Sequence, residues 1–347
     1  MFQVIQTIIF TEEDLKLESN RKQVSEALRA SKLVVFPTET VYGIGANAKS
    51  PSASRQIYET KGRPSDNPLI VHIAHLEDVY QYVESVSDAA IILMHAFWPG
   101  PLTLIFNKNN VIPLETTGGL HTIAMRLPRN EIARRMIIDA DLPIAAPSAN
   151  LSGKPSATEF KHVVKDFLGK VDIMIDGGHS EIGLESTVID TTTDVPVILR
   201  PGFITREMIE SVLGYPVIDQ SDSRPTGEVK SPGMKYTHYK PKGEVFIIEG
   251  TIMNMASYVK NEQKMQSGKS IAVICEAEYQ GYFNCKVRSL GSLYNQNEMA
   301  NNLFSALRDM DDWQIDVIYI HHIGIQGLGY AVMNRLIKAS SYHIIQV

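Results

Sequence analysis

The chain has 347 residues, enough for about two domains that each bury a core. Its formal net charge of −6 at pH 7 and isoelectric point near 5.9 argue against a protein held to nucleic acid by bulk positive charge, and leave open only a local basic patch. The two cysteines, Cys275 and Cys285, form neither a C-x-x-C motif nor a disulfide framework, so we expect a reducing, cytoplasmic location.

The most apolar stretch, residues 89–106, could be mistaken for a membrane span. It is interrupted in its middle by Trp98-Pro99-Gly100-Pro101, which predicts a helix, a turn and a strand instead. The N-terminal region contains Glu12 and Glu13 and has no signal-peptide layout. We therefore expect no membrane association.

The first 215 residues or so alternate strand and helix signals, but helices do not separate every pair of strands. This pattern predicts an α/β domain with a mixed sheet. We expect strands at 34–37, 68–74, 102–106, 123–127, 142–146, 171–175, 187–190 and 197–199. We expect helices from Ser50 or Ser52 to Thr60, from Ser87 to Trp98, from Asn130 to Ala140, and after a cap at Thr158.

Hydrophobic periodicity stops between Asp219 and Gly243. The second part of this segment, residues 231–241, carries two tyrosines, a histidine and two lysines between prolines, which is unusual for a spacer. It is either an active-site lid or an ordered connector. Beyond it, strands at 245–248, 271–275 and 315–320 alternate with helices at 251–264, 297–310 and 329–339. We therefore predict a first domain at 1–215, a linker at 216–243, and a small βαβ domain at 244–347.

A turn after the first predicted helix has the composition of an anion-binding site. Lys61 and Arg63 lie two residues apart on a turn stiffened by glycine and proline, with Ser65 and Asn67 beside them. The lysine ammonium group is a compact positive charge. The arginine guanidinium is planar and can donate two parallel hydrogen bonds to phosphate oxygens. A solvated, charged turn is the alternative.

Further polar side chains stand where predicted strands begin or end. Because sites in sheet proteins gather at strand ends, we expect some of these groups to meet. Together with Lys61 and Arg63, two more arginines would supply four cations for a triphosphate and a carboxylate. The strand-end candidates are Thr122, Arg126, Ser148, Asn150, Ser156, Ser186 and Arg200.

Several motif matches are interpreted as coincidental. The G-x-G-x-x-A match at 43–48 begins too far after its strand to bind a dinucleotide, and the P-loop-like 267–270 precedes a strand instead of following one. The glycine-rich segment 324–329 could hold an anion at a helix N-terminus or be a simple turn. The histidine pairs lack the remaining ligands of a metal cage, so we expect no metal centre built by the protein.

Four ordered motifs resemble those of the YrdC-domain family. They are PTETVYGIG at 37–45, KGRPSDNP at 61–68, PSAN at 147–150 and STV at 186–188. With residues 231–241 and the trailing domain, the chain resembles the two-domain L-threonylcarbamoyladenylate synthases of this family. Ile44 stands where leucine is common. The resemblance implies a twisted α/β sheet with a concave basic face, followed by a linker with a lid and a Rossmann-like accessory domain.

The resemblance also implies a reaction. L-threonine, bicarbonate or CO2, and ATP would give threonylcarbamoyl-AMP and pyrophosphate, the first step of N6-threonylcarbamoyladenosine modification beside the anticodon of tRNA. Mg²⁺ would be held mainly by phosphates and water. The product could pass to a tRNA threonylcarbamoyl transferase, with at most a weak contact to tRNA. A carbamoyl-transfer module, an RNA-binding module and a dehydrogenase are the rival interpretations.

Site residues follow from the resemblance, motif by motif. It implies an ATP site formed by Lys61, Arg63, Ser65, Asn67, Thr122, Ser148, Asn150, Ser156, Arg200 and His238. It implies a threonine site formed by Thr40, His72, Arg126, Ala146 and Ser186. Lys61 and Arg63 are the expected catalytic residues, and Tyr236 and His238 the expected lid residues.

Overall fold

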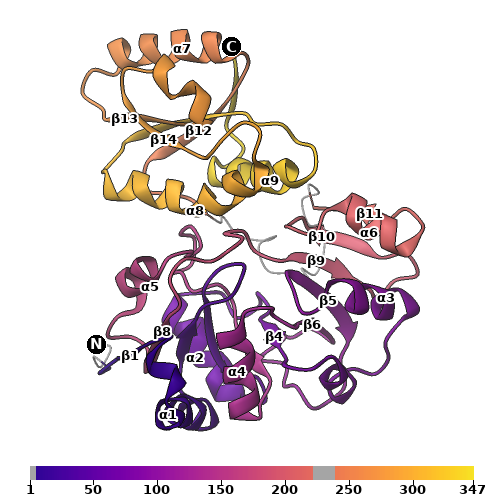
Figure 1. The fold of residues 1–347 in the computed structure, drawn as a ribbon. Coiled ribbons are helices and arrows are strands. Elements are labelled where there is room, and N and C mark those ends of the chain that lie inside the picture. The colour runs from indigo at the N-terminus through magenta and orange to yellow at the C-terminus, as the bar shows by residue number, and fades with distance from the viewer. Residues whose placement is uncertain (1–4, 222–238) are drawn as a thin grey trace. The chain divides into compact units, whose positions relative to one another are not determined.

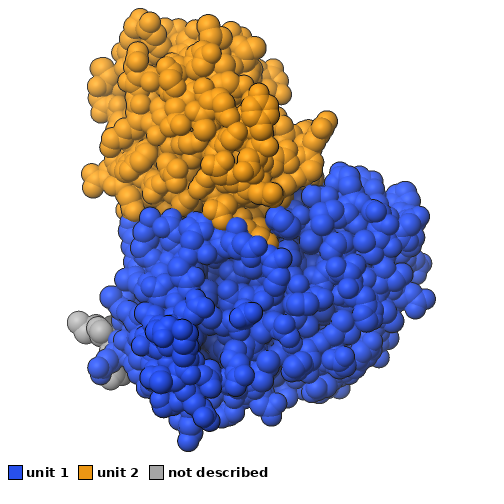
Figure 2. Space-filling model, in the orientation of Figure 1, with its two compact units in different colours: residues 1–152, 157–181, 185–235 blue, residues 153–156, 182–184, 236–347 orange. Residues whose placement is uncertain are grey.

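The computed structural model describes residues 5–221 and 239–347. These residues divide into two compact units (Figures 1 and 2). The first comprises 5–152, 157–181 and 185–221, and the second comprises 153–156, 182–184 and 239–347. The candidate lid residues Tyr236 and His238 lie outside the described part of the chain.

The first unit is built on one mixed sheet of eleven strands in the order β1-β8-β2-β3-β7-β4-β6-β5-β9-β10-β11 (Figure 1). Parallel pairs such as β4–β6 occur beside antiparallel pairs such as β5–β6, as predicted. The strands are β1 (Ile8–Thr11), β2 (Val34–Phe36), β3 (Gly43–Asn47), β4 (Ile70–His72), β5 (Leu102–Asn107), β6 (Thr122–Arg126), β7 (Ile144–Ala145), β8 (Ile173–Asp176), β9 (Thr187–Asp190), β10 (Val197–Arg200) and β11 (Ile218–Asp219).

Helices pack on both faces of this sheet because successive strand residues point to opposite sides. Val34 and Phe36 pack with α1 and α4, whereas Val35 between them packs with the helices of the other face. The helices are α1 (Glu18–Arg29), α2 (Pro51–Lys61), α3 (Asp88–Phe97), α4 (Glu131–Ala140), α5 (Phe160–Phe167) and α6 (Arg206–Leu213), with short 3-10 turns η1 (Asp14–Lys16) and η2 (Leu76–Gln81).

One face of the sheet over β4, β6, β5, β9 and β10 carries only a small apolar cluster, which includes Ile70 and Ala124. This cluster contains strand residues alone. His72 and Arg126 each follow one of these residues by two positions, so their side chains lie on the same face. A pocket lies on this part of the face, and Ile70, His72 and Arg126 line it.

The second unit contains a five-stranded parallel sheet in the order β14-β13-β15-β12-β16. Helices lie on both faces, with α7 on one and α8 and α9 on the other (Figure 1). The predicted βαβ architecture is therefore confirmed. The elements are β12 (Glu244–Glu249), α7 (Ile252–Met265), β13 (Ile271–Cys275), η3 (Ala277–Tyr282), β14 (Lys286–Ser289), α8 (Gln296–Asp312), β15 (Val317–His321), α9 (Leu328–Ala339) and β16 (Ile344–Gln346).

Helix starts follow the predicted caps with one exception. The side chains of Ser50, Ser87 and Asn130 each accept a hydrogen bond from a backbone N–H in the first turn. The cap predicted at Thr158 is wrong: Glu159 caps α5, because its side chain and that of His162 form a reciprocal capping box.

The G-x-G-x-x-A segment is a strand. Residues 43–47 form β3, which pairs antiparallel with β2, so these glycines do not form a phosphate-binding turn. A Cβ at Gly45 would lie 2.7 Å from both Ile144 Cγ2 and Phe36 Cε1. Close packing therefore explains the glycine. In the described ranges, no helix is both long and apolar enough to cross a bilayer.

Candidate active site

A pocket opens on the face of the first unit's sheet that carries Ile70, His72 and Arg126. It is lined by all five residues expected to hold threonine and by three expected to hold ATP. The first group is Thr40, His72, Arg126, Ala146 and Ser186, and the second is Arg63, Ser148 and Arg200. Residues separated by up to 160 positions in the chain thus meet in one place.

Seven further residues line the same pocket and were not among the predicted site residues. They are Thr38, Val41, Tyr42, Gly43, Ile70, Pro147 and Glu185. Five of them lie within two positions of a predicted residue in the same motif or strand, and Gly43 lies three positions after Thr40 in the same motif, which is the signal that could have found them. Glu185 directly precedes Ser186, two positions before β9 begins at Thr187, and could have been included for that reason.

The pairing of two parallel strands brings His72 and Arg126 together. β4 and β6 are in register with these two residues opposite each other. Arg126 Nη1 donates to Thr40 Oγ1 at 2.7 Å, and its Nε donates to the Gly100 carbonyl at 3.2 Å. The guanidinium is therefore fixed by a hydroxyl and a carbonyl from two different loops.

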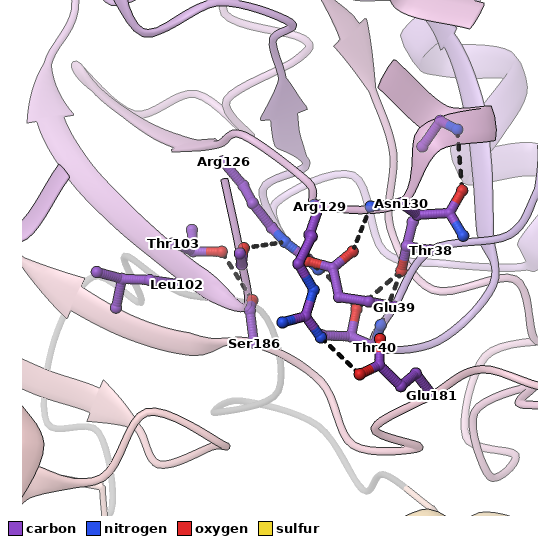
Figure 3. A network of polar contacts seen from close by, with 12 residues as sticks. Thr38, Glu39, Thr40, Leu102, Thr103, Arg126, Arg129, Asn130, Glu181 and Ser186 are labelled. Atoms are coloured by element: carbon purple, nitrogen blue, oxygen red, sulfur yellow. Dashed lines mark hydrogen bonds and ion pairs between the residues drawn. The ribbon is translucent and has the colours of Figure 1, made fainter. Parts of the chain in front are cut away.

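The other side of Arg126 is held by a buried carboxylate (Figure 3). Glu39 Oε1 lies 2.7 Å from Arg126 Nη2 and also accepts from the Arg129 amide at 3.0 Å. Burial alone raises the pKa of Glu39, but the Arg126 charge and the Arg129 amide outweigh it and hold the pKa below its ordinary value. Glu39 is thus a charged, fully engaged partner of Arg126.

His72 is a neutral side chain in the pocket wall. Its Nδ1 lies 3.1 Å from the Ile70 carbonyl, and the edge of its ring meets Phe36. Burial, followed by the adjacent Arg126 charge, lowers the pKa of His72 to about 3. At neutral pH the imidazole therefore adds hydrogen-bonding capacity to the pocket without adding charge.

Ser186 is oriented by two buried neighbours. Its hydroxyl lies 2.7 Å from Thr103 Oγ1, as Figure 3 shows, and accepts from Arg200 Nη2 at 3.1 Å. Arg200 Nε also donates to the Ser186 carbonyl at 3.0 Å. Since Thr103 is fully buried, it holds the Ser186 hydroxyl from inside the protein.

The predicted lysine–arginine turn is rigid, but only one of its two cations lines the pocket. α2 ends at Lys61, and Gly62 caps it in the left-handed region at φ 62°. Arg63 Nη2 donates to Asn67 Oδ1 at 2.6 Å. Lys61 is 2% exposed, and its Nζ donates to the carbonyls of Ser148 and Asn150. Through these two hydrogen bonds, Lys61 fixes the position of the loop that carries Ser148.

The remaining predicted nucleotide residues do not line this pocket. Thr122 begins β6, and four residues of extended strand place it about 13 Å from Arg126. Ser65 is exposed on its turn, and Asn150 Oδ1 accepts from Ser148 Oγ at 2.6 Å. Ser156 belongs to the second unit, and His238 lies outside the described residues.

The charge of the pocket favours an anion. Three arginines and one glutamate line it, His72 is neutral, and burial raises the pKa of Tyr42, so its phenol is also neutral. Within 5–221 and 239–347, no group of three or more His, Cys, Asp or Glu side chains is placed to hold a metal ion. The pocket can bind carboxylate and phosphate through preorganised donors.

Comparison with known proteins bears on this pocket and on both units. A family model for Sua5, YciO and YrdC, described as telomere recombination, matches residues 26–202, which include every residue that lines the pocket. A second model, described as the threonylcarbamoyl-AMP synthase C-terminal domain, matches residues 204–341. The chain belongs to the Sua5/YrdC family of threonylcarbamoyl-AMP synthases. It is accordingly an ATP-using enzyme that transfers an adenylyl group.

Relatives in this family are similar over nearly the whole chain. The threonylcarbamoyl-AMP synthase of Pyrococcus abyssi is 47% identical over 92% of this chain and 94% of its own length. That of Bacillus subtilis is 43% identical over 95% of this chain and 96% of its own. A crystal structure of P. abyssi Sua5 complexed with L-threonine superposes with a TM-score of 0.91, at 45% identity, covering 98% of this chain and 99% of that one.

Proposed function

We propose that the enzyme joins L-threonine, bicarbonate or CO2, and ATP to give L-threonylcarbamoyl-AMP and pyrophosphate. The observation that carries the proposal is that the five residues expected to hold L-threonine, Arg126 among them, line one pocket together with Arg63 and Arg200. The P. abyssi relative crystallised with L-threonine supports the same substrate. The proposed catalytic domain is 1–215, followed by a linker with a lid at 216–243 and an accessory domain at 244–347.

Threonine would bind through its charged and polar groups. Arg126 is the proposed partner of the α-carboxylate, because a fixed guanidinium matches a carboxylate with two donors. Thr40, His72 and Ser186 supply neutral hydrogen-bonding groups around it, and Ala146 and Ile70 offer apolar contact for the side-chain methyl. Holding the amino acid in one orientation is a direct contribution to rate.

The nucleotide would bind beside the threonine through cations. Arg63 and Arg200 line the pocket and are the proposed contacts for the phosphates, with Ser148 as a neutral donor. Lys61, Ser65, Asn67, Thr122, Asn150, Ser156 and His238 complete the proposed ATP site. Lys61 and Arg63 are the proposed catalytic residues, Lys61 also holding the Ser148 loop.

Mg²⁺ is the proposed counter-ion of the phosphates. The described residues offer no cluster of three potential protein ligands, which fits an ion held mainly by phosphate oxygens and water. The ion would neutralise charge on the phosphates. The protein's own contribution is to position donors and exclude water.

The chemistry needs no covalent enzyme intermediate. A threonine carbamate oxygen attacks the α-phosphorus of ATP, and pyrophosphate leaves. Arginines already held in place stabilise the charge that develops on the phosphate. The mixed anhydride hydrolyses readily, so we propose that Tyr236 and His238 close over it as a lid. The product would then serve tRNA modification in the cytoplasm, through a threonylcarbamoyl transferase.

The test is pyrophosphate release from ATP with and without threonine and bicarbonate, while labelled bicarbonate is traced into an adenylate. We expect release to require both co-substrates and the label to appear in the product. Release without threonine, or none at all, would refute the proposal. Tight, salt-sensitive RNA binding without turnover would favour the RNA-binding interpretation.

A further inference from the structure

Glu185 is the single acidic side chain among the described residues that line the pocket. It is 5% exposed and lies two positions before β9 begins, directly before Ser186. A Cβ at Gly202 would lie 2.8 Å from the Glu185 carbonyl and 2.5 Å from the Thr187 amide, so this segment packs closely on another backbone. Glu185 is therefore an acidic residue on closely packed backbone, in the wall of a pocket that three arginines also line.

The other buried carboxylate of the region has a different position. Glu39 lies behind Arg126, where one oxygen contacts that guanidinium and the Arg129 amide and the other faces the Asn130 amide at 3.4 Å. It is not among the residues that line the pocket. Glu39 thus positions Arg126, and Glu185 is the carboxylate that a bound amino acid would meet.

The proposed reaction creates a need for a proton acceptor. When the threonine nitrogen attacks CO2, the adduct carries a positively charged nitrogen, and it must lose a proton to become a carbamate. The groups around the pocket that could take part are Arg63, Arg126, Arg200, His72 and Tyr42, with Glu39 behind Arg126. The arginines are permanent cations and cannot accept a proton.

The two neutral groups are also poor acceptors. His72 has a pKa of about 3, because burial and Arg126 disfavour its cation, so it is a weaker base than an ordinary glutamate carboxylate. The Tyr42 hydroxyl donates to the Gly178 carbonyl at 2.8 Å and accepts from the Gly177 amide at 3.0 Å. Among the described residues that line the pocket, the Glu185 carboxylate is the remaining base.

We propose that Glu185 is the general base of carbamate formation. The threonine ammonium group first loses one proton to solvent. The lone pair of the resulting amine forms the N–C bond, one C=O electron pair of CO2 moves onto oxygen, and the second proton leaves the adduct nitrogen for Glu185. The products of this step are threonine carbamate and the Glu185 carboxylic acid, which then returns its proton to solvent. No oxidant or reductant is needed. This inference rests on the proposed function.

The charged residues of the pocket also complement the charged groups of threonine before the reaction. Threonine arrives with a carboxylate and an ammonium group, and the pocket offers the Arg126 guanidinium for the first and the Glu185 carboxylate for the second. Charge-assisted hydrogen bonds of this kind are about twice as strong as neutral ones. The same carboxylate would orient the nitrogen and then take its proton.

The test compares E185Q and E185D with the control E181Q. Gln keeps the size of Glu but replaces one acceptor oxygen with an NH2 donor and cannot accept the proton, whereas Asp keeps the base. Glu181 lies four positions upstream and is 67% exposed in its pair with Arg129. We expect E185Q to lower kcat at saturating threonine by about 10²–10³-fold, E185D to recover at least tenfold of this loss, and E181Q to match the wild type.

The pH profile separates a base from a merely structural residue. In E185Q the proton must pass to solvent, so we expect kcat to rise with pH between about 7 and 9 more steeply than in the wild type. A wild-type rate in E185Q would overturn the proposal. So would a rate loss with an unchanged pH profile, or a rise in the threonine KM alone. If the wild type itself shows no threonine-dependent pyrophosphate release, the proposed function fails instead.

Discussion

Glu39 and Arg126 form an ion pair at 2.7 Å whose side chains are only 2% and 5% exposed. The neighbouring pair of Glu181 and Arg129 has the same 2.7 Å separation but is 67% and 50% exposed (Figure 3). The two pairs therefore differ mainly in solvent access. Breaking a buried pair leaves a charge in a poorly solvating environment, whereas an exposed charge is readily solvated.

We expect E39Q to destabilise the protein by about 3–5 kcal/mol, because Arg126 keeps its charge and loses its compensating partner. E181Q should change stability by less than about 1 kcal/mol. Urea unfolding of both variants at pH 7.5 measures the difference. E39Q should also raise the threonine KM more than it lowers kcat, if Arg126 holds the substrate carboxylate. Equal stability of the two variants would contradict this account of the buried pair.

Arg63 provides a test of the nucleotide contacts. We expect Arg63→Ala to reduce kcat by about 10²–10³-fold, the loss seen when one preorganised donor to developing charge is removed. Arg55→Ala is the matched control, since Arg55 lies on α2, the helix that precedes the Arg63 turn, and pairs with Glu115 at a half-exposed site. Steady-state pyrophosphate release checks both variants. Near-normal turnover in Arg63→Ala would remove Arg63 from the catalytic residues.

The buried imidazole predicts how stability depends on pH. An unfolded His72 binds a proton below its ordinary pKa of 6.5, whereas the folded one stays neutral down to about 3. The unfolded state therefore binds more protons within this window, and stability falls as the pH drops through it. The expected slope approaches about 1.4 kcal/mol per pH unit.

Unfolding between pH 6.5 and 5 isolates this contribution, because the pKa of Glu39 is lowered from 4.5 and its charge is lost only at more acidic pH. His72→Asn should flatten the slope of stability against pH in this range. His95→Asn, at an exposed position, should leave the slope unchanged. An identical slope in His72→Asn and the wild type would show that the imidazole does not stay neutral.

Thr103 predicts a positioning effect on Ser186. Thr103→Val keeps the side-chain shape but removes the hydroxyl that lies 2.7 Å from Ser186 Oγ. Loss of a buried hydrogen-bond partner costs about 1–3 kcal/mol, so we expect a threonine KM roughly tenfold higher, with a smaller change in kcat. Thr103→Ser should restore binding, and the exposed Thr193→Val should have no effect. Isothermal calorimetry with threonine gives the direct measurement.

Local chemistry in the chain was sufficient to predict many of the elements. Serine and asparagine caps, proline interruptions and β-branched runs act over a few residues, so most predicted helices and strands are present within a few positions. Several candidate site residues could also be predicted from the sequence, because hydroxyl and arginine side chains cluster at the ends of predicted strands. The prediction at Thr158 was wrong because two adjacent residues could both cap, and the reciprocal bond between Glu159 and His162 decided between them.

Only the tertiary structure decided which of these groups meet. The register of β4 against β6 puts His72 beside Arg126, while Thr122 lies at the far end of the same strand. Solvent access likewise depends on contacts between distant segments, so the separate positions of Glu39 behind the pocket and Glu185 within its wall could not be read from the motifs that contain them. The sequence by itself determined the chemical groups available, and the sheet determined their partners and their charge, because strand register and burial are properties of segments far apart in the chain.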